Sequence, residues 1–536
     1  MATTSIGRVP VKRRGALAAA AALSMPRLAR AQGGGTLKFI PQIDLAFLDP
    51  HFTTAYVTRG HGHMVFDTLY GQDGSFRASP QMVEGHAVED GGKLWTLTLR
   101  PGLLWHDGER VLARDCTASI RRWARRDALG GALMAATEEL SAPDDRTIRF
   151  RLRRPFPMLP DALGKVTSPM PAMMPERLAN TDPFRQITEV VGSGPFRFLA
   201  DERVPGSRNV YARFDRYVPR EGGAPDWNAG PKRVHLDRVE WTTIPDAATK
   251  VAALQRGEQD WWENPTHDLL PLLRRERRIK IDVINPTGSV NMMRPNHLQP
   301  PFNNPGVRRA LLWAFDQSAF MQAIVGDDPA MYRVPHGFFC PGTPMASEDG
   351  LEPLRGPRDL EKAKRLLKEA GYAGEKAAML VATDYAQFKA IGEVAADAMG
   401  KIGVNVDYVA TDWGTMLQRR NNKGPVDGGG WSCLSTGWEG VDHMDPSSHY
   451  AIRGNGNEAS AWPGWCVSPR LEELRDAWFE APDLAAQQRI CRDMQVQCMV
   501  DVPSIPLGQY VQPTAYRAAL TGVLKGFPTF WNVRRA

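Results

Sequence analysis

A long hydrophobic run is missing from this sequence once the first 31 residues are passed. A helix that crosses a bilayer needs about 20 consecutive apolar residues, so we expect no membrane-spanning segment in the remainder. Cysteine is also scarce, at six in 536 residues, and the first, Cys116, lies far from the N-terminal segment. A lipid-anchored lipoprotein needs a cysteine directly after its signal. We therefore expect a chain that is freely soluble after export.

The N-terminal segment itself has the order of features that is typical of a secretory signal. Four basic residues precede an apolar run over 15–25, and small residues follow where a signal peptidase cleaves. The apolar run is too short to span a membrane. The Arg13-Arg14 pair leaves the twin-arginine route open beside the general secretory route. We predict that residues 1–31 are removed and that the mature protein is soluble in the periplasm.

Basic residues exceed acidic ones only because of that segment. The chain has 66 Lys and Arg against 60 Asp and Glu, and residues 1–31 hold six of the basic residues and none of the acidic ones. The predicted mature chain therefore carries 60 of each kind. Without an excess of basic residues, the main reason to expect a nucleic acid or an acidic membrane surface as a partner is gone. We predict no nucleic-acid partner.

The six cysteines allow two interpretations. Exported proteins meet an oxidising compartment in which thiols pair, and Cys433–Cys466 is the pair to test first. Cys491 and Cys498 fall on one predicted helix, where they would lie roughly 10 Å apart, beyond disulfide reach. The alternative is a set of small buried thiols without partners.

Strand-like and helix-like segments alternate along the chain. Three segments have the pattern of strands, namely 36–40, 93–99 and 146–152. Five segments have apolar residues at helical spacing, namely 116–126, 307–325, 359–370, 471–480 and 484–500. Asp359 is a suitable N-cap, and Gly371 suits a left-handed position after the helix. This alternation predicts an α/β architecture.

Motifs that would carry catalysis or bind a metal are absent from the sequence. It has no Gly-x-Ser-x-Gly, no His-Glu-x-x-His and no paired carboxylates in a catalytic context. The glycine-rich segment 192–195 lacks the continuation of a phosphate-binding loop. His61 and His63 supply at most two ligands for nickel or zinc. Four further residues fit no standard zinc spacing, namely Cys433, His443, His449 and Cys466. We predict no metal, no cofactor and no enzymatic activity.

Six separated segments resemble, in the same order, elements of a known protein family. They are 66–70, 95–109, 191–198, 301–310, 360–372 and 502–507. The second segment carries the most specific match, Leu-Arg-Pro-Gly-Leu-Leu-Trp-His-Asp-Gly at 99–108. Together they are similar to the family 5 extracellular solute-binding proteins of bacterial ABC transporters, which bind dipeptides, oligopeptides or nickel chelates.

The resemblance implies an α/β, two-lobe periplasmic binding protein fold of class II, or cluster C, with an extra subdomain on lobe I. Lobe I would comprise 36–67, 195–285 and 504–536, the accessory subdomain 68–194, and lobe II 286–503. Hinge closure would bury the ligand between the lobes. The protein, expected to be a monomer, would then deliver it to the transmembrane subunits of an ABC permease.

A ligand amine inside such a cleft needs a carboxylate, because a charge is costly to bury without a partner. Peptide binders of the family place an Asp four residues before a Pro, after a Gly-Trp. Gly437-Trp438, Asp442 and Pro446 keep that spacing, with one residue inserted after the tryptophan. Asp442 is the predicted amine anchor, and a loop-capping Asp is the alternative. Asp445 is predicted to be structural, since Asp-Pro favours a turn.

One departure from the oligopeptide binders concerns the ligand carboxylate. Those proteins carry an Arg just before the Gly-Trp, where this chain has Leu434-Ser435-Thr436. That carboxylate clamp is therefore lost, which weakens the case for ordinary peptides. Arg294 or Arg453 would have to supply the positive charge from elsewhere.

The other predicted ligand-binding residues are Trp438, Trp431, Asn296, Trp262, Glu263, Thr54 and Tyr56. The tryptophans would form aromatic walls, since such rings bury a large area at small entropy cost; ordinary core tryptophans are the alternative. Asn296, Thr54 and Tyr56 are taken from the resemblance, which places them on cleft-facing segments. The predicted function is capture of a peptide-like or amine-bearing small solute. A nickel chelate or other non-peptide solute is the alternative within this class, and a secreted hydrolase is the alternative outside it.

Overall fold

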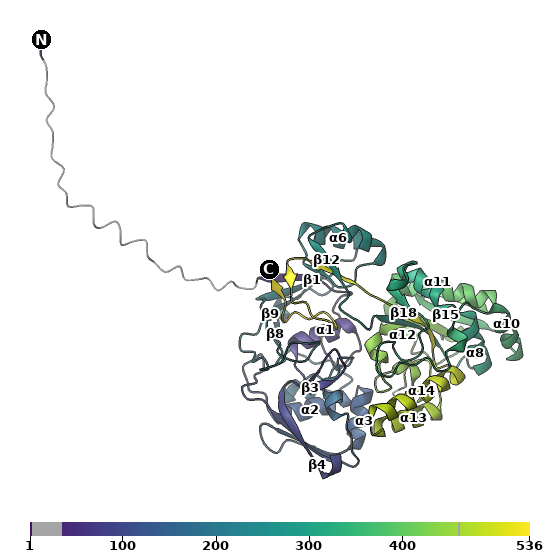
Figure 1. Ribbon diagram of the computed structural model, residues 1–536, viewed down its shortest axis with the longest axis horizontal. Coiled ribbons are helices and arrows are strands. Elements are labelled where there is room, and N and C mark those ends of the chain that lie inside the picture. The colour runs from purple at the N-terminus through teal and green to yellow at the C-terminus, as the bar shows by residue number, and fades with distance from the viewer. Residues whose placement is uncertain (3–34, 459–460) are drawn as a thin grey trace.

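The protein forms two lobes that lie side by side, with a third, smaller unit packed below one of them in the view of Figure 1. The computed structural model describes residues 1–2, 35–458 and 461–536. The predicted secretory signal, apart from its first two residues, lies outside the described residues. No helix in the described part of the chain has both the length and the apolar character needed to cross a membrane.

Lobe I is built on a seven-stranded sheet with the order β12-β19-β11-β1-β10-β9-β8. The central strand β1 runs parallel to β10 and β11, and the outer pairs are antiparallel. The strands are β1 (Thr36–Ile40), β8 (Phe196–Phe198), β9 (Arg208–Arg213), β10 (Arg238–Thr242), β11 (Trp261–Trp262), β12 (Ile279–Asp282) and β19 (Thr514–Arg517). The lobe also contains α1 (Tyr56–Val65), α6 (Ala247–Arg256), α7 (Leu270–Arg274) and the short strands β20 (Leu520–Thr521) and β21 (Arg534–Arg535). Three separate stretches of the sequence thus form one sheet.

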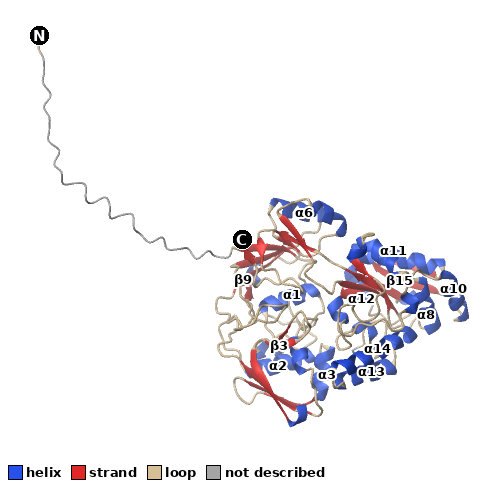
Figure 2. Ribbon diagram, viewed as in Figure 1, coloured by secondary structure: helices blue, strands red, loops and turns tan. Residues whose placement is uncertain are grey.

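Lobe II is built on a six-stranded mixed sheet with the order β14-β18-β13-β17-β15-β16, flanked by helices (Figure 2). The strands are β13 (Ser289–Pro295), β14 (Tyr332–Arg333), β15 (Lys376–Ala382), β16 (Asn405–Thr411), β17 (Cys433–Glu439) and β18 (Ile505–Tyr510). The helices are α8 (Pro305–Ala314), α9 (Gln317–Val325), α10 (Leu360–Glu369), α11 (Ala386–Lys401), α12 (Trp413–Arg419), α13 (Pro469–Glu480) and α14 (Leu484–Asp501). The last residue of β17, Glu439, reaches the boundary with lobe I, where it pairs with Arg59 of α1.

The chain passes between the two sheets twice. The first crossing lies within 283–288, between β12 and β13, and the second within 511–513, between β18 and β19. The predicted start of the last lobe I stretch at residue 504 is wrong, because β18 pairs with β13 and β14 in the lobe II sheet. Residues 505–510 therefore belong to lobe II.

The smaller unit contains a four-stranded antiparallel sheet, a two-stranded hairpin and four helices. These are β4 (Val83–Glu89), β5 (Leu94–Leu99), β7 (Thr147–Leu152) and β6 (Thr137–Ser141); β2 (Tyr70–Gln72) and β3 (Ala78–Pro80); and α2 (Ala113–Ala124), α3 (Ala128–Ala136), α4 (Leu159–Gly164) and α5 (Glu176–Ala179). A buried ion pair joins it to lobe I, with Arg122 Nη2 2.7 Å from Asp49 Oδ2. It also contacts lobe II, where Phe156 stacks on Phe479 with ring centroids 5.9 Å apart. This unit therefore touches both lobes.

Local sequence signals explain where several helices begin and end. The helix predicted over 359–370 is confirmed as α10, where the Asp359 carboxylate accepts a hydrogen bond from the Lys362 N–H at 2.9 Å. Gly371 follows with a φ of +76°, as expected after a helix end. The single helix predicted over 307–325 is wrong. It is divided into α8 and α9, because Asp316 caps a new helix by accepting from the Ser318 N–H at 2.9 Å.

The remaining predicted elements are confirmed, with ends shifted by up to three residues, as β1, β5, β7, α2, α13 and α14. All six cysteines lie in the described part of the chain, where they are free and buried. Of the two interpretations left open by the sequence, small buried thiols are confirmed, and Cys433 and Cys466 are not paired. Burial raises the pKa of Cys466 to about 11, so this thiol packs as an apolar group.

Candidate functional site

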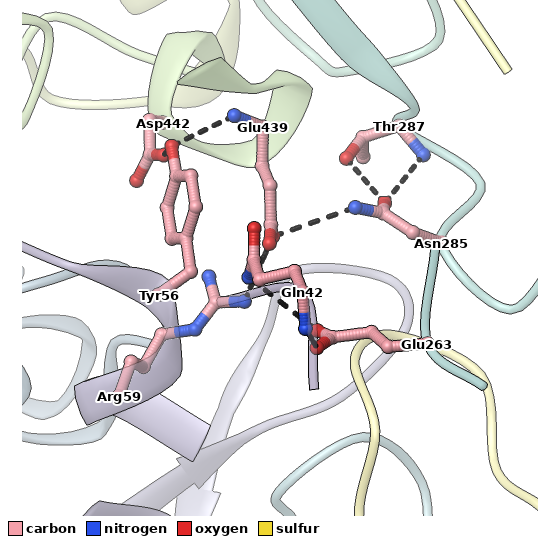
Figure 3. Close-up of polar contacts among 8 residues, drawn as sticks. All are labelled: Gln42, Tyr56, Arg59, Glu263, Asn285, Thr287, Glu439 and Asp442. Carbon is pink, nitrogen blue, oxygen red and sulfur yellow. Dashed lines mark hydrogen bonds and ion pairs between the residues drawn. The ribbon is translucent and has the colours of Figure 1, made fainter. Parts of the chain in front are cut away.

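Charged side chains from the two lobes meet where α1 of lobe I faces the end of β17 of lobe II (Figure 3). Tyr56 begins α1, and Arg59 lies three residues later on the same helical face. Opposite them, Glu439 is the last residue of β17, and Asp442 lies in the following 3₁₀ turn, Gly440–His443. The sequence thus presents two side chains from each lobe at one boundary.

The Tyr56 hydroxyl joins the lobes through two hydrogen bonds. It donates to Asp442 Oδ2 and accepts from the Glu439 N–H at 2.8 Å. Asp442 itself is buried and has no ion-pair partner among the described residues. Within the described part of the chain, the side-chain donor to this carboxylate is therefore a neutral hydroxyl rather than a cation.

Arg59 forms the second connection between the lobes. Its Nη2 lies 2.8 and 2.9 Å from the two carboxylate oxygens of Glu439. The faces of the guanidinium pack against the rings of Tyr56 and Phe527, with Cζ 4.8 and 4.9 Å from the ring centroids. Its Nε and Nη1 are buried without an acceptor. This cation is therefore held in place but is only partly satisfied.

Burial shifts the protonation of two acids at this boundary. It raises the pKa of Asp442 to about 6, against the opposing effect of the Arg59 charge. It also raises the pKa of Glu263 to about 7, although the Gln42 N–H donates to this carboxylate at 2.7 Å. Of the charged side chains in Figure 3, three are acids and Arg59 is the cation. The arrangement therefore suits an additional positive charge.

A pocket opens beside these residues on the lobe I side. It is lined by Phe39, Tyr56, Val57, Arg59, Gly60, Trp241, Glu263, Phe527 and Pro528. Its walls are largely aromatic and aliphatic, and its charged groups are Arg59 and Glu263. The space inside it is about 10 Å³, close to that of a single water molecule, so it holds no small-molecule guest in this arrangement of the lobes.

The predicted site residues divide into two groups. Tyr56, Glu263 and Asp442 come together at the lobe boundary, and half-buried Trp438 lies directly before Glu439. The Trp438 ring packs against His443 and Trp462, with centroids 5.3 Å apart in each case. Thr54 is exposed, two residues before α1.

The other three predicted residues make packing contacts within the lobes. Trp431 is fully buried, and its Nε1 donates to the Arg420 carbonyl at 2.9 Å. Asn296 is buried, donating to the Trp431 carbonyl at 2.8 Å and accepting from the Leu298 N–H at 3.0 Å. Trp262 is buried in lobe I, under the Lys250 ammonium. None of these three takes part in the cluster of Figure 3.

Sequence reasoning missed Arg59, Glu439 and Gln42. Arg59 follows Tyr56 at helical spacing, so an expected helix over this segment would have indicated a shared face. Glu439 directly follows Trp438, within the segment that contains the predicted amine anchor. Their pairing, however, brings together positions 380 residues apart.

His61 and His63, the pair considered for nickel or zinc, make packing and hydrogen-bond contacts within lobe I. His61 Nδ1 is 3.0 Å from the Tyr211 hydroxyl, and His63 packs against Phe527 with centroids 4.8 Å apart. Burial lowers the pKa of His61 to about 3. Within residues 35–458 and 461–536, no three His, Cys, Asp or Glu side chains form a group suited to a metal.

Two lobes joined by two chain crossings, with side chains of both meeting at their boundary, form the architecture of a two-lobe periplasmic binding protein. The chain belongs to the bacterial extracellular solute-binding proteins, family 5, whose model for the middle region matches residues 77–460. The resemblance inferred from the sequence motifs is therefore confirmed. This family consists of binding proteins.

Individual relatives extend the match to nearly the whole chain. The probable peptide ABC transporter periplasmic-binding protein y4tO of Sinorhizobium fredii is 38% identical over 527 residues, covering 97% of this chain and 98% of that protein. The solved structure of AgaA from A. tumefaciens R10, in complex with agropinic acid, has a TM-score of 0.78 at 21% identity, covering 94% and 99% of the two chains. DppA of Helicobacter pylori, in complex with the peptide STSA, has a TM-score of 0.78 at 22% identity, covering 94% and 98%. These likenesses confirm the predicted two-lobe α/β fold.

Proposed function

We propose that this protein is the periplasmic solute-binding component of an ABC importer and that it captures a peptide-like or amine-bearing small solute. The observation that carries the proposal is Asp442, a buried carboxylate at the lobe boundary that has no ion-pair partner among the described residues. An ammonium group would supply the charge that this carboxylate lacks. The names of the S. fredii and H. pylori proteins, which refer to peptides, support the same class of solute.

Capture would exchange one partner of Asp442 for another. When the lobes separate, the Tyr56 hydroxyl leaves the Asp442 carboxylate, because the two residues belong to different lobes. The guest amine then takes that position, and the lobes close again over the guest. Closure restores the Arg59–Glu439 ion pair and so favours the shut form. The aromatic walls around Arg59 and Glu263 would accept the apolar part of the guest.

The proposal includes the fate of the solute and of the protein. The guest is released unchanged to the transmembrane subunits of a permease, so the protein is not an enzyme. It acts as a soluble monomer without a nucleic-acid partner, after removal of residues 1–31. If the solute were a nickel chelate, the purified protein would carry a bound metal. If the protein were a hydrolase, the bound molecule would be a chemically altered product.

The first experiment identifies the guest. Protein purified from the periplasm without denaturation would be analysed by mass spectrometry for bound small molecules and metals. We expect an amine-bearing solute of unchanged structure, without stoichiometric nickel. Recovery of a nickel chelate, or of a cleaved product, would overturn this assignment.

The second experiment tests Asp442 with that solute. At 100-fold its Kd, the solute should stabilise the wild-type protein by about 2.7 kcal/mol in thermal unfolding. Asp442→Asn should abolish the stabilisation without lowering the melting temperature of the unliganded protein, because an amide removes a charge that is costly to bury.

Asp445→Asn is the matched control for this test. Asp445 is the next acid in the same segment, but its carboxylate caps the chain by accepting from the Ser447 N–H at 2.8 Å. We expect this variant to melt earlier and still to be stabilised by the solute. Wild-type binding by Asp442→Asn would remove Asp442 from the site.

A further inference from the structure

Arg420 carries a partly buried positive charge for which the described residues provide no counter-ion. It follows the last residue of α12, and its side chain is half-buried. The Nε is shut off from solvent without an acceptor, and no side-chain hydrogen bond or ion pair of this guanidinium occurs in the described part of the chain. Burial lowers its pKa to about 10. A buried N–H without an acceptor is costly, so the site favours an added acceptor.

Three other arginines of lobe II differ from Arg420, because each has partners within the protein. Arg419 donates to the carbonyls of Gly429 and Gly430, both at 3.0 Å. Arg294, one of two candidates for a carboxylate clamp in the sequence, donates to the carbonyls of Pro463, Ala451 and Pro503 at 2.7–3.0 Å. The other candidate, Arg453, lies near Glu472 and helps to lower the pKa of that carboxyl. These three cations are used within the protein.

An aromatic pair connects Arg420 to the lobe boundary. Its Cζ lies 5.7 Å from the ring centroid of half-buried Trp462, and Arg294 Cζ lies 4.7 Å from the same ring. Trp462 packs in turn on Trp438, the residue before Glu439, at 5.3 Å. Two cations thus share one indole ring, which increases the need for an anion. In Figure 1, α12 lies toward the lobe I side of lobe II.

We infer that Arg420 binds the carboxylate of the captured solute, at the end of an aromatic path that begins beside Asp442. This inference rests on the proposed function, which places the solute amine at Asp442. A guanidinium binds a carboxylate through two parallel hydrogen bonds, which Lys or Gln does not reproduce. Arg420 therefore supplies the clamp that the missing Arg at 434–436 would have provided.

The position of Arg420 beyond the Trp462 ring also bears on the kind of guest. Between Trp438 and Arg420 lie two contacts of 5.3 and 5.7 Å through the Trp462 ring. In a free amino acid the ammonium and the carboxylate share one carbon atom, whereas an extended peptide spans about 3.3–3.6 Å per residue. Because the Trp462 ring lies between Trp438 and Arg420, the inferred solute is a zwitterion whose ammonium and carboxylate belong to different residues, such as a short peptide.

The test compares free carboxylates with amides. An equimolar library of tripeptides and tetrapeptides, and the same library with C-terminal amides, are offered to the wild-type protein; competition followed by mass spectrometry gives relative affinities. The wild type should prefer the free acids by about 10- to 100-fold, as for hydrogen bonds between charged groups. Arg420→Gln should reduce the ratio to near one, and Arg420→Lys should leave an intermediate preference.

Arg419→Gln is the matched control, because it removes an adjacent arginine that bonds only backbone carbonyls in the described structure. It should keep the wild-type preference. Circular dichroism confirms that each variant is folded, and the wild-type comparison is informative without any variant. No preference in the wild type, or an unchanged preference in Arg420→Gln, would overturn the role of Arg420. Retention of neither library by the wild type would instead refute the proposed peptide-like solute.

Discussion

Buried charges inside lobe I differ from those at the lobe boundary in how fully their partners satisfy them. Within lobe I, the Asp67 carboxylate accepts from Lys232 Nζ at 2.7 Å and from the Tyr217 hydroxyl at 3.0 Å. Both side chains of the Asp67–Lys232 pair are at most 1% exposed. At the boundary, Arg59 pairs with Glu439, yet two of its guanidinium nitrogens are buried without an acceptor. The buried Asp67–Lys232 pair therefore has its hydrogen-bond partners, whereas the Arg59–Glu439 pair leaves two buried nitrogens of Arg59 without an acceptor.

This difference follows from where the partners lie in the fold. Asp67 and Lys232 belong to the same lobe, so movement of the lobes leaves their bonds intact. Arg59 and Glu439 belong to different lobes, so both return to water when the lobes separate. A complete network fixes the position of chain segments, whereas an incomplete one between two bodies can change partners. Removing a charge should therefore affect stability inside lobe I and conformation at the boundary.

Lys232→Met should give the largest loss of stability. It leaves the Asp67 carboxylate buried without its cation, and breaking one side of a buried ion pair costs about 3–5 kcal/mol. Thermal unfolding of the unliganded protein, followed by circular dichroism, measures this loss. Lys525→Met is the control, because Lys525 pairs with Asp282 at 3.0 Å on the surface, with 56% of its side chain exposed. An exposed pair contributes about 0–1 kcal/mol. Equal losses in the two variants would show that burial is not the cause.

Glu263→Gln should change how stability depends on pH. The pKa of Glu263 is about 7 in the folded protein, against 4.5 ordinarily. Between these values the folded chain keeps a proton that the unfolded chain has released. The free energy of unfolding therefore falls with rising pH across this window, by about 1.4 kcal/mol per unit from this group. Glu263→Gln removes that contribution, so it should be more stable than the wild type above pH 7, by at most about 3 kcal/mol.

Chemical denaturation at several pH values between 4 and 8 checks this expectation. Glu258→Gln is a suitable control, since the pKa of exposed Glu258 is lowered by its bond to Arg256. The stability that this group contributes is lost only as the pH falls below about 4.5. Parallel curves for the wild type and Glu263→Gln would mean that Glu263 does not retain its proton in the folded state.

Signals within a few residues predicted part of this site, and pairings between lobes explain the part that was missed. Asp442 was indicated by the family resemblance, through its spacing from Trp438 and Pro446, and that pattern lies within one short segment. The Arg59–Glu439 pair depends on how two separately folded lobes face each other, and no local periodicity encodes that relation. Tryptophans show the same limit. Trp431 and Trp262 are 0% and 1% exposed in the lobe cores. An aromatic side chain with the same flanking residues would suit the wall of a cleft equally well.

The fold was predictable to a similar degree. The six motifs indicated the two-lobe architecture, and caps such as Asp359 fixed individual helix ends. The division at Asp316 was missed because apolar residues continue at helical spacing across it. Strand β18 was assigned to the wrong lobe because an apolar strand carries no signal for which sheet it joins; that choice is made by its bonds to β13.

Glu439→Gln should have the smallest effect on stability and a clear effect on conformation. Arg59 loses its ion-pair partner, but opening of the lobes returns its guanidinium to water, so the loss of unfolding free energy should stay below about 1 kcal/mol. Small-angle X-ray scattering of the unliganded variant should show a larger radius of gyration than the wild type. Glu480→Gln is the control, because its exposed pair with Arg154 also joins lobe II to the accessory unit, yet both side chains are already in contact with water. Destabilisation of Glu439→Gln to the level of Lys232→Met, with an unchanged radius of gyration, would mean that the boundary charges are fixed as firmly as those inside lobe I. The lobes could not then exchange Tyr56 for a guest at Asp442.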